Sequence, residues 1–361
     1  MRTGVANLPL HSGKAPRWLF DRMTLLAGAV TEMIVEEYGP EKMLERLADP
    51  RWFQAFGCIL GFDWHSSGVT TTTCGAIKEG IKRRESELGL YVAGGKGGAS
   101  RRTPDEIAGF ASQIGGAIDG EGLVRASKLA AKVDNTALQD GYQLYHHCFF
   151  FTNGGHWAVV QQGMNDTNHF ARRYHWFSPS VASFVDEPHS GIASETSGQQ
   201  VLNLVANESD QSRSAVTDLV LQGPTAVKKE LAAVEKLQMP ARHWIAAEDL
   251  AVRGFDKVLI EAYERQPKDF TDLLTVKGLG PKTLRALVMV AELAYGAKPS
   301  WRDPAVYSFA HGGKDGIPYP VDRPTYDETV SVLRRAIGSS KMGQTDKLCA
   351  IKRLAGFWPD A

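Results

Sequence analysis

Apolar residues recur at helical spacing over much of the first part of the chain. Residues 15–38 show this pattern throughout. Serine and threonine residues after Gly61 compete for backbone hydrogen bonds, so the sequence predicts a loop that ends near residue 74. Further helices are predicted from Pro40, over 74–87, from Thr103 and over 121–133, with a short strand over 90–92.

The clearest β-pattern lies between residues 142 and 162. Residues 142–151 are rich in aromatic and apolar side chains and predict one strand. Asn153-Gly154-Gly155 provides a tight turn, and residues 156–162 predict the returning strand. We expect the aromatic and basic residues 172–176 to follow in a loop, beside a sheet that contains this hairpin.

The rest of the chain has a different pattern. Residues 190–215 are rich in Ser, Gln, Asn and Asp and predict a linker. The predicted fold class is therefore α+β, with a mixed α/β domain over residues 1–205, which contains the hairpin, and an all-α domain over 206–361. The helices expected in the second domain cover 225–238, 246–264, 267–276, 281–295, 325–337 and 345–356.

Composition limits the classes of partner. The 361 residues carry 41 Lys and Arg and 41 Asp and Glu, so any binding to nucleic acid must come from local basic patches. The 4 cysteines form no CxxC pair and are expected to be reduced thiols. No apolar run reaches the roughly 18 residues of a membrane span, and no signal-peptide core is present. We therefore expect a cytoplasmic protein.

Residues 273–290 carry the most specific chemical pattern. An apolar helix leads into Gly278-Leu279-Gly280, and Pro281 starts a second apolar helix. The glycines leave the backbone open to approach, and the N–H groups at the start of the second helix favour an anion. The alternative is a tight αα-hairpin whose glycines only permit close packing. The side chains predicted to contact DNA here, together with Gly278 and Gly280, are Lys277, Lys282, Thr283 and Arg285.

The pattern over residues 267–295 resembles the helix-hairpin-helix motif, which grips a DNA backbone phosphate without reading sequence. Residues 267–337 resemble, more weakly, the helix-hairpin-helix DNA glycosylases, because Pro-Val-Asp follows the hairpin at a helix start. That resemblance implies that Lys282 attacks the sugar as a Schiff-base amine and that Asp322 is the assisting carboxylate. The long segment between the two residues departs from the family pattern, and a helix N-cap also accounts for Asp322.

Two further segments combine basic residues with glycines. Lys96, Arg101 and Arg102 border a glycine-rich run, which predicts either a flexible loop on a nucleic-acid backbone or a solvated turn. His311 and Lys314 lie in a loop with paired glycines. This loop is either a second phosphate-contacting segment or a surface Ω-loop.

The β-hairpin region offers candidates for nuclease chemistry. Asp140, His146 and His147 are candidate catalytic residues, but the lysine that restriction-type nuclease cores need on the following strand is missing. Adjacent strand residues point to opposite faces, so only one of the two histidines can face a given site. Arg172 and Arg173 stand beside aromatic residues and are predicted either to contact DNA or to cap a core.

Metal ligands are predicted only weakly. Asp63, His65 and Asp140 are the candidates, and their spacing is not diagnostic of any metal. A divalent metal would be needed by a nuclease and not by a glycosylase.

Nearly the whole chain is similar to an uncharacterised archaeal and bacterial family catalogued as domain of unknown function 763. The resemblance implies a shared fold and brings no established activity with it. The segments that carry it are Gly61–Gly75, Gly94–Pro104, Gln139–His147, Val159–Asn165, Ala171–Trp176 and Tyr307–Asp322.

The functional hypothesis is a cytosolic DNA-processing enzyme of the repair type that acts on duplex, damaged or single-stranded DNA. Its concrete forms are a DNA glycosylase/AP lyase that uses Lys282 and Asp322, or a metal-dependent nuclease with its site in the N-terminal domain. A non-catalytic DNA-binding module and, last, a small-molecule enzyme are the alternatives.

Overall fold

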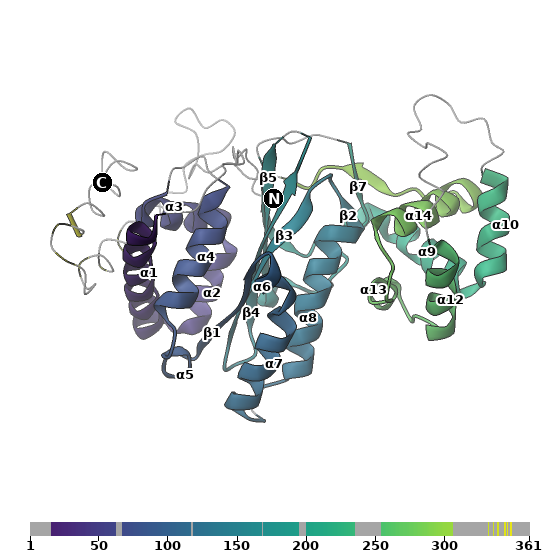
Figure 1. The fold of residues 1–361 in the computed structure, drawn as a ribbon. Helices are drawn as coiled ribbons and strands as arrows, with labels where there is room; N and C mark the ends of the chain where they lie inside the picture. The colour runs from purple at the N-terminus through teal and green to yellow at the C-terminus, as the bar shows by residue number, and fades with distance from the viewer. Residues whose placement is uncertain are drawn as a thin grey trace.

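The computed structural model describes residues 16–62, 67–116, 118–167, 169–194, 200–234 and 254–305, with isolated positions between 331 and 348. The chain folds around a five-stranded antiparallel sheet that has helices on both faces. A helical region with a small three-stranded sheet continues from one side of it (Figure 1).

Helices of the N-terminal part cover one face of the sheet. The helix predicted over 15–38 is confirmed, whereas the helix expected near 74 already begins at Gly68. The threonines expected in a loop lie in that helix because Thr70 and Thr73 are fully buried, and packing overrides their low helix propensity. These elements are α1 (Arg17–Tyr38), α2 (Pro40–Ala48), α3 (Pro50–Leu60), α4 (Gly68–Gly80) and the short α5 (Glu85–Leu88).

The large sheet has the strand order β1-β3-β4-β5-β6. The predicted hairpin is confirmed as β3 and β4, with Phe151 opposite Trp157 at its closed end. The loop predicted over 172–176 is wrong, because these residues form β5 and are buried in the sheet. Its polar side chains, which suggested a loop, are satisfied by internal partners. The strands are β1 (Leu90–Lys96), β3 (Gln143–Thr152), β4 (Trp157–Asn165), β5 (Phe170–Phe177) and β6 (His189–Ala193).

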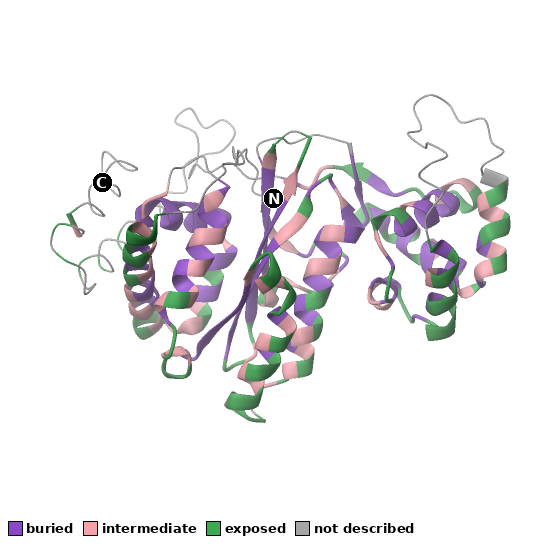
Figure 2. Cartoon of the chain, in the orientation of Figure 1, coloured by how far each residue is buried: buried purple, intermediate pink, exposed green. Residues whose placement is uncertain are grey.

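The second face of the sheet packs against helices that begin at the glycine-rich run. Phe149 and Phe151 of β3 point to this face, whereas Cys148 and Phe150 point to α1–α4. Figure 2 shows the strands buried over most of their length, with less buried ends, and the exposed outer sides of these helices. The elements are α6 (Gly98–Arg101), α7 (Thr103–Ile114), α8 (Gly120–Lys132) and a π-helical turn, η1 (Val133–Ala137), that extends α8.

The second half of the chain packs on the same core. The cluster that covers Phe149 continues to Leu219 and Leu284 in the helical region. The helices are α9 (Asp210–Leu221), α10 (Pro224–Val234), α12 (Phe255–Arg265), α13 (Phe270–Leu274) and α14 (Pro281–Tyr295). The small sheet is formed by β2 (Leu138–Gln139), β7 (Gln200–Asn203) and β8 (Ser300–Arg302), and the 3₁₀ turns are η2 (Ser178–Ser180) and η3 (Asn207–Ser209).

Two expectations for this half are corrected. The segment 190–215 is not a linker, since it contains most of β6, then β7 and the start of α9. The half is not purely helical either, because β8 pairs with β7. The helices expected over 325–337 and 345–356 lie almost wholly outside the described residues. Among the helices that the structure describes, none combines the length and apolar character needed to cross a membrane.

Candidate functional site

The hairpin between α13 and α14 forms one end of the helical region. Lys277, Gly278 and Lys282 are exposed there, while Thr283 is buried in the first turn of α14. Gly278 has φ +86°, the left-handed conformation that favours glycine. The turn between α13 and α14 therefore uses the conformational freedom of Gly278.

Neither the backbone conformation of Gly280 nor the space around it requires a glycine. It is the N-cap of α14 with φ −112° and ψ 176°, which any residue adopts. A Cβ built at Gly280 would meet nothing nearer than the carbonyl oxygen of Gly278, at 3.9 Å. The space in front of Gly280 is open, and the N–H groups of Lys282 and Thr283 begin the helix there without intrahelical acceptors.

Three side-chain contacts hold the hairpin against the N-terminal part. Lys132 Nζ donates a hydrogen bond to the carbonyl of Leu279, and burial lowers the pKa of Lys132. Gln139 Nε2 donates to the carbonyl of Pro281 at 2.9 Å, and Arg285 Nε donates to Gln139 Oε1 at 2.8 Å. Arg285, a predicted phosphate contact, is thus engaged in positioning the hairpin on β2.

A cleft of about 630 Å³ separates α8 from the hairpin. Arg125, Lys128 and Lys277 line it, and Lys128 also lines a cavity of about 270 Å³ together with Arg101. The two hollows therefore join the glycine-rich segment to the hairpin over the surface of α8. The acidic residues of the cleft are Glu121 and Asp272, and Asp272 is ion-paired with Arg265 at 3.4 Å.

Six lysine and arginine side chains lie along the surface that runs from the glycine-rich segment over α8 to the hairpin. Each of them is exposed, and none forms an ion pair with a residue that the structure describes. Lys96 lies over the ring of Tyr145, which lines the smaller cavity, at 5.6 Å from the ring centroid. We name this set the basic strip; its members are Lys96, Arg101, Arg125, Lys128, Lys277 and Lys282.

A buried hydrogen-bonded chain starts in the smaller cavity. Gln161 Nε2 donates to Asp134 Oδ2 at 2.6 Å, so Gln161 Oε1 must accept from His147 Nδ1, at 2.7 Å. Burial lowers the pKa of His147, so the ring is neutral and its Nε2 accepts from the hydroxyl of Ser127, at 2.8 Å. The network thus fixes one tautomer of His147 and points its unprotonated nitrogen at a hydroxyl in a cavity lined by strip cations.

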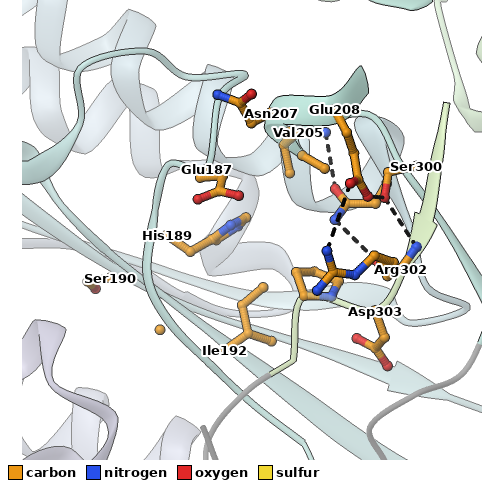
Figure 3. A pocket seen from close by; sticks show the side chains of 14 residues that line it. Glu187, His189, Ser190, Ile192, Val205, Asn207, Glu208, Ser300, Arg302 and Asp303 are labelled. Carbon is orange, nitrogen blue, oxygen red and sulfur yellow. Dashed lines mark hydrogen bonds and ion pairs between the residues drawn. The ribbon is translucent and has the colours of Figure 1, made fainter. Parts of the chain in front are cut away.

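The same chain ends in a second pocket, of about 600 Å³, beside β6, β7 and β8 (Figure 3). His189 Nε2 lies 2.5 Å from Asp134 Oδ1, and Asp134 sits in the π-helical turn. Glu187, next to His189 in the pocket, has φ +44° although it is not glycine. A strained residue and a π-helical turn beside a His–Asp pair are features that concentrate at functional sites. The opposite wall carries Glu208.

The arginines predicted to contact DNA in β5 are inside the protein. Arg172 NH1 and NH2 form ion pairs with Asp140 at 3.0 Å and Asp303 at 2.9 Å. Arg173 donates to Gln54 at 2.9 Å, and burial lowers its pKa to about 9. Both guanidinium groups are fully buried, so neither is at the surface where a backbone phosphate could reach it.

Asp140, proposed from the sequence as a catalytic or metal-binding carboxylate, is also buried. Its oxygens accept from Arg172, from the hydroxyl of Tyr174 at 2.7 Å and from the backbone of Tyr142 at 3.1 Å. Burial raises the pKa of Asp140, while the charge of Arg172 lowers it. The structure thus places this carboxylate in an internal network.

His146 and His147 point to opposite faces of β3, as expected. His147 faces α8 through Ser127, whereas His146 lies on the α4 side with Cys148. Arg102, another predicted DNA contact, is exposed at the start of α7. Five predicted site residues lie outside the described part of the chain, namely Asp63, His65, His311, Lys314 and Asp322.

The sequence patterns did not identify several residues that the structure brings to these hollows. Arg125 and Lys128 stand three positions apart on the polar side of a correctly predicted helix, a signal that was available. Asp134 and His189 carried no signal, because one follows the predicted end of that helix and the other sits at the start of the supposed linker.

A comparison with protein families matches nearly the whole chain, including the residues of these sites. A sequence model described as "Protein of unknown function (DUF763)" matches residues 4–321. The chain belongs to this family. The DUF763 match therefore includes the basic strip, the buried hydrogen-bonded chain, the cleft beside α8, the smaller cavity and the pocket beside His189. No curated protein and no solved structure matches the chain.

The buried histidines of this DUF763 protein predict a dependence of stability on pH. Burial lowers the pKa of His146 to about 3 and lowers the pKa of His147 and of His175. Below pH 6.5 the unfolded chain therefore binds protons that the folded chain does not, and stability falls as pH decreases. From pH 7.5 to 5.5 we expect His146 to account for a loss of about 1.4 kcal/mol, and His147 and His175 to contribute in the same direction. Asp140, whose pKa is raised, opposes part of this loss.

Urea unfolding at the two pH values measures this effect. The variant His156→Gln is the matched control, because His156 is exposed at the β3–β4 turn and should leave the difference unchanged. Equal free energies of unfolding at pH 7.5 and 5.5 would contradict the expectation.

Proposed function

We propose that this protein is a DNA-binding, DNA-processing enzyme of the repair type, which holds the phosphate backbone on the basic strip. The observation that supports this most is the run of exposed cations from the glycine-rich segment over α8 to the hairpin. The whole chain has zero formal net charge, so a local excess of cations that have no ion-pair partner in the described part of the chain is significant.

The geometry of the strip suits a backbone more than a small anion. Arg125 and Lys128 project three positions apart from the exposed side of α8. Lys277 faces them across the cleft. A duplex laid along this path would contact both halves of the protein, and its phosphates would meet the open N–H groups at Gly280.

The variant Gly280→Asp separates DNA binding from stability. Aspartate is a favourable N-cap, and its charge suits the positive end of α14, so folding should be unaffected or slightly improved. Its carboxylate would occupy the space in front of Gly280 and repel a phosphate. We expect affinity for duplex DNA, measured by fluorescence anisotropy, to fall roughly tenfold or more.

Gly280→Asn is the matched control, since it has the same size and also caps a helix but carries no charge. Its affinity should lie between those of the wild type and Gly280→Asp. Equal affinities of wild type and Gly280→Asp, with unchanged melting temperature, would place the phosphate away from this hairpin.

Two chemistries fit the proposal. In the glycosylase/AP lyase form, Lys282 supplies the amine, and the resemblance assigns the carboxylate to Asp322. In the hydrolytic form, the His189 pocket supplies the reactive groups, because His189 is held by Asp134 beside the strained Glu187. Hydrolysis needs a proton acceptor for water, which the imidazole of a His–Asp pair provides.

One set of reactions distinguishes them. Duplexes with an abasic site, oxoguanine or uracil are incubated with borohydride or with EDTA in parallel. Covalent trapping by borohydride that is lost in Lys282→Ala supports the lyase. Cleavage that gives no trapped adduct and is lost in His189→Ala supports the hydrolytic form at the His189 pocket. The sensitivity of this cleavage to EDTA reports whether a metal takes part. Binding without any product favours the non-catalytic module.

A further inference from the structure

Sulfur and imidazole donors converge on the side of β3 opposite His147. Cys74 comes from α4, and His146 and Cys148 lie two positions apart on β3, so they share its α4-facing side. One ligand atom from each of the three residues lies within 4.8 Å of the others. All three side chains are about 1% exposed. The packing of α4 against β3 thus brings the Cys74 thiol, which is distant in the sequence, next to the imidazole and the thiol on β3.

The imidazole of His146 has no hydrogen-bond partner at either ring nitrogen among the residues that the structure describes. A buried polar ring without a partner is costly, because it gives up its hydrogen bonds to water on folding. An imidazole in its neutral form carries a lone pair on its unprotonated nitrogen, and no described residue donates a hydrogen bond to that nitrogen in His146. A neutral imidazole next to two thiols is in the state that a metal ion requires.

We propose that Cys74, His146 and Cys148 bind one Zn²⁺ ion. The donor set is soft, with two sulfurs and one nitrogen and no carboxylate, which suits Zn²⁺ and not Mg²⁺ or Ca²⁺. With Zn–S bonds of about 2.3 Å in a tetrahedron, neighbouring donors lie about 3.8 Å apart, so the present cluster needs only a small contraction. Three protein ligands leave a fourth position for water or another small ligand.

The charge around the cluster also suits a metal thiolate. The thiols of Cys74 and Cys148 are hydrogen-bonded to each other, and the positive charge of the buried Arg173 acts on Cys74. Zn²⁺ displaces the thiol proton to solvent, and the resulting thiolate gains both the metal and the nearby guanidinium as counter-charges. The ion would fix α4 to β3, on the face of β3 opposite His147.

The site is tested on the full chain by metal analysis and by cobalt substitution. Protein purified from zinc-supplemented cells should contain about one Zn²⁺ per chain. Protein stripped of metal should give a thiolate-to-cobalt charge-transfer band when Co²⁺ is added, and the tetrahedral band pattern should disappear when Zn²⁺ displaces it. This titration uses the unaltered chain, so it does not depend on whether a variant folds.

Variants then locate the ligands. Cys74→Ser, Cys148→Ser and His146→Ala should each reduce bound zinc at least tenfold. Cys58→Ser is the matched control, because Cys58 is another buried cysteine that is not in the cluster, and it should retain full zinc content. The proposal is overturned if wild-type protein binds neither zinc nor cobalt, if Cys58→Ser loses metal equally, or if peptide mapping finds Cys74 and Cys148 joined in a disulfide.

Discussion

Replacing Arg125, Lys128 and Lys277 together with alanine is expected to weaken binding to duplex DNA by about a hundredfold at 0.15 M salt. Each cation in contact with a phosphate releases about 0.9 counterion, so three lost contacts remove about 2.7 units from the slope of log affinity against log salt. The three side chains are exposed, and none is ion-paired with a described residue. Their removal should therefore leave the folded structure intact.

The measurement is fluorescence anisotropy with a labelled duplex, and the control is a second triple variant. Lys42, Lys82 and Lys228 are cations outside the strip, of which Lys82 and Lys228 are exposed and Lys42 is partly exposed, and their carboxylate partners lie 2.7–3.0 Å away. Alanine at these positions makes the same change in net charge. If both triple variants lose affinity equally, the binding reflects net charge and the basic strip has no special role.

Replacing Arg172 with methionine is expected to destabilise the protein by about 3–5 kcal/mol. Burial alone lowers the pKa of Arg172, but the charges of Asp140 and Asp303 outweigh it and hold the pKa above the usual value. Without the guanidinium, these two carboxylates remain buried without their cation. Because Asp303 follows β8, the change should also loosen the attachment of the second half to β5.

Urea unfolding measures this loss, and Arg102→Met is the matched control because Arg102 is exposed at the start of α7. The control should change the free energy of unfolding by less than about 0.5 kcal/mol. A loss below about 1 kcal/mol in Arg172→Met would mean that water or rearrangement compensates the two carboxylates.

Local patterns predicted the elements whose side chains follow a simple periodicity. The β3–β4 hairpin was found because apolar residues flank a turn that requires glycine, and α14 was found because Pro281 starts an apolar repeat. These signals are local, so a single sequence contains them. At the turn before α14, Gly278 has a positive φ, whereas Gly280 has a conformation that any residue adopts.

Elements stabilised by distant polar partners could not be predicted in this way. For Arg172 and Arg173 the sequence left open a loop that contacts DNA or a cap on a core. They are buried because Asp140, Asp303 and Gln54 come from elsewhere in the chain. The pairing of His146 with Cys74 likewise depends on how α4 packs against β3.

A salt titration of the wild-type protein on duplex DNA tests the central claim most directly. If all six members of the basic strip contact phosphates, log affinity should fall against log salt with a slope of about −5. Gly280→Asp should bind weakly at every salt concentration. A flat dependence of affinity on salt would contradict the account, because a backbone held by cations must release counterions.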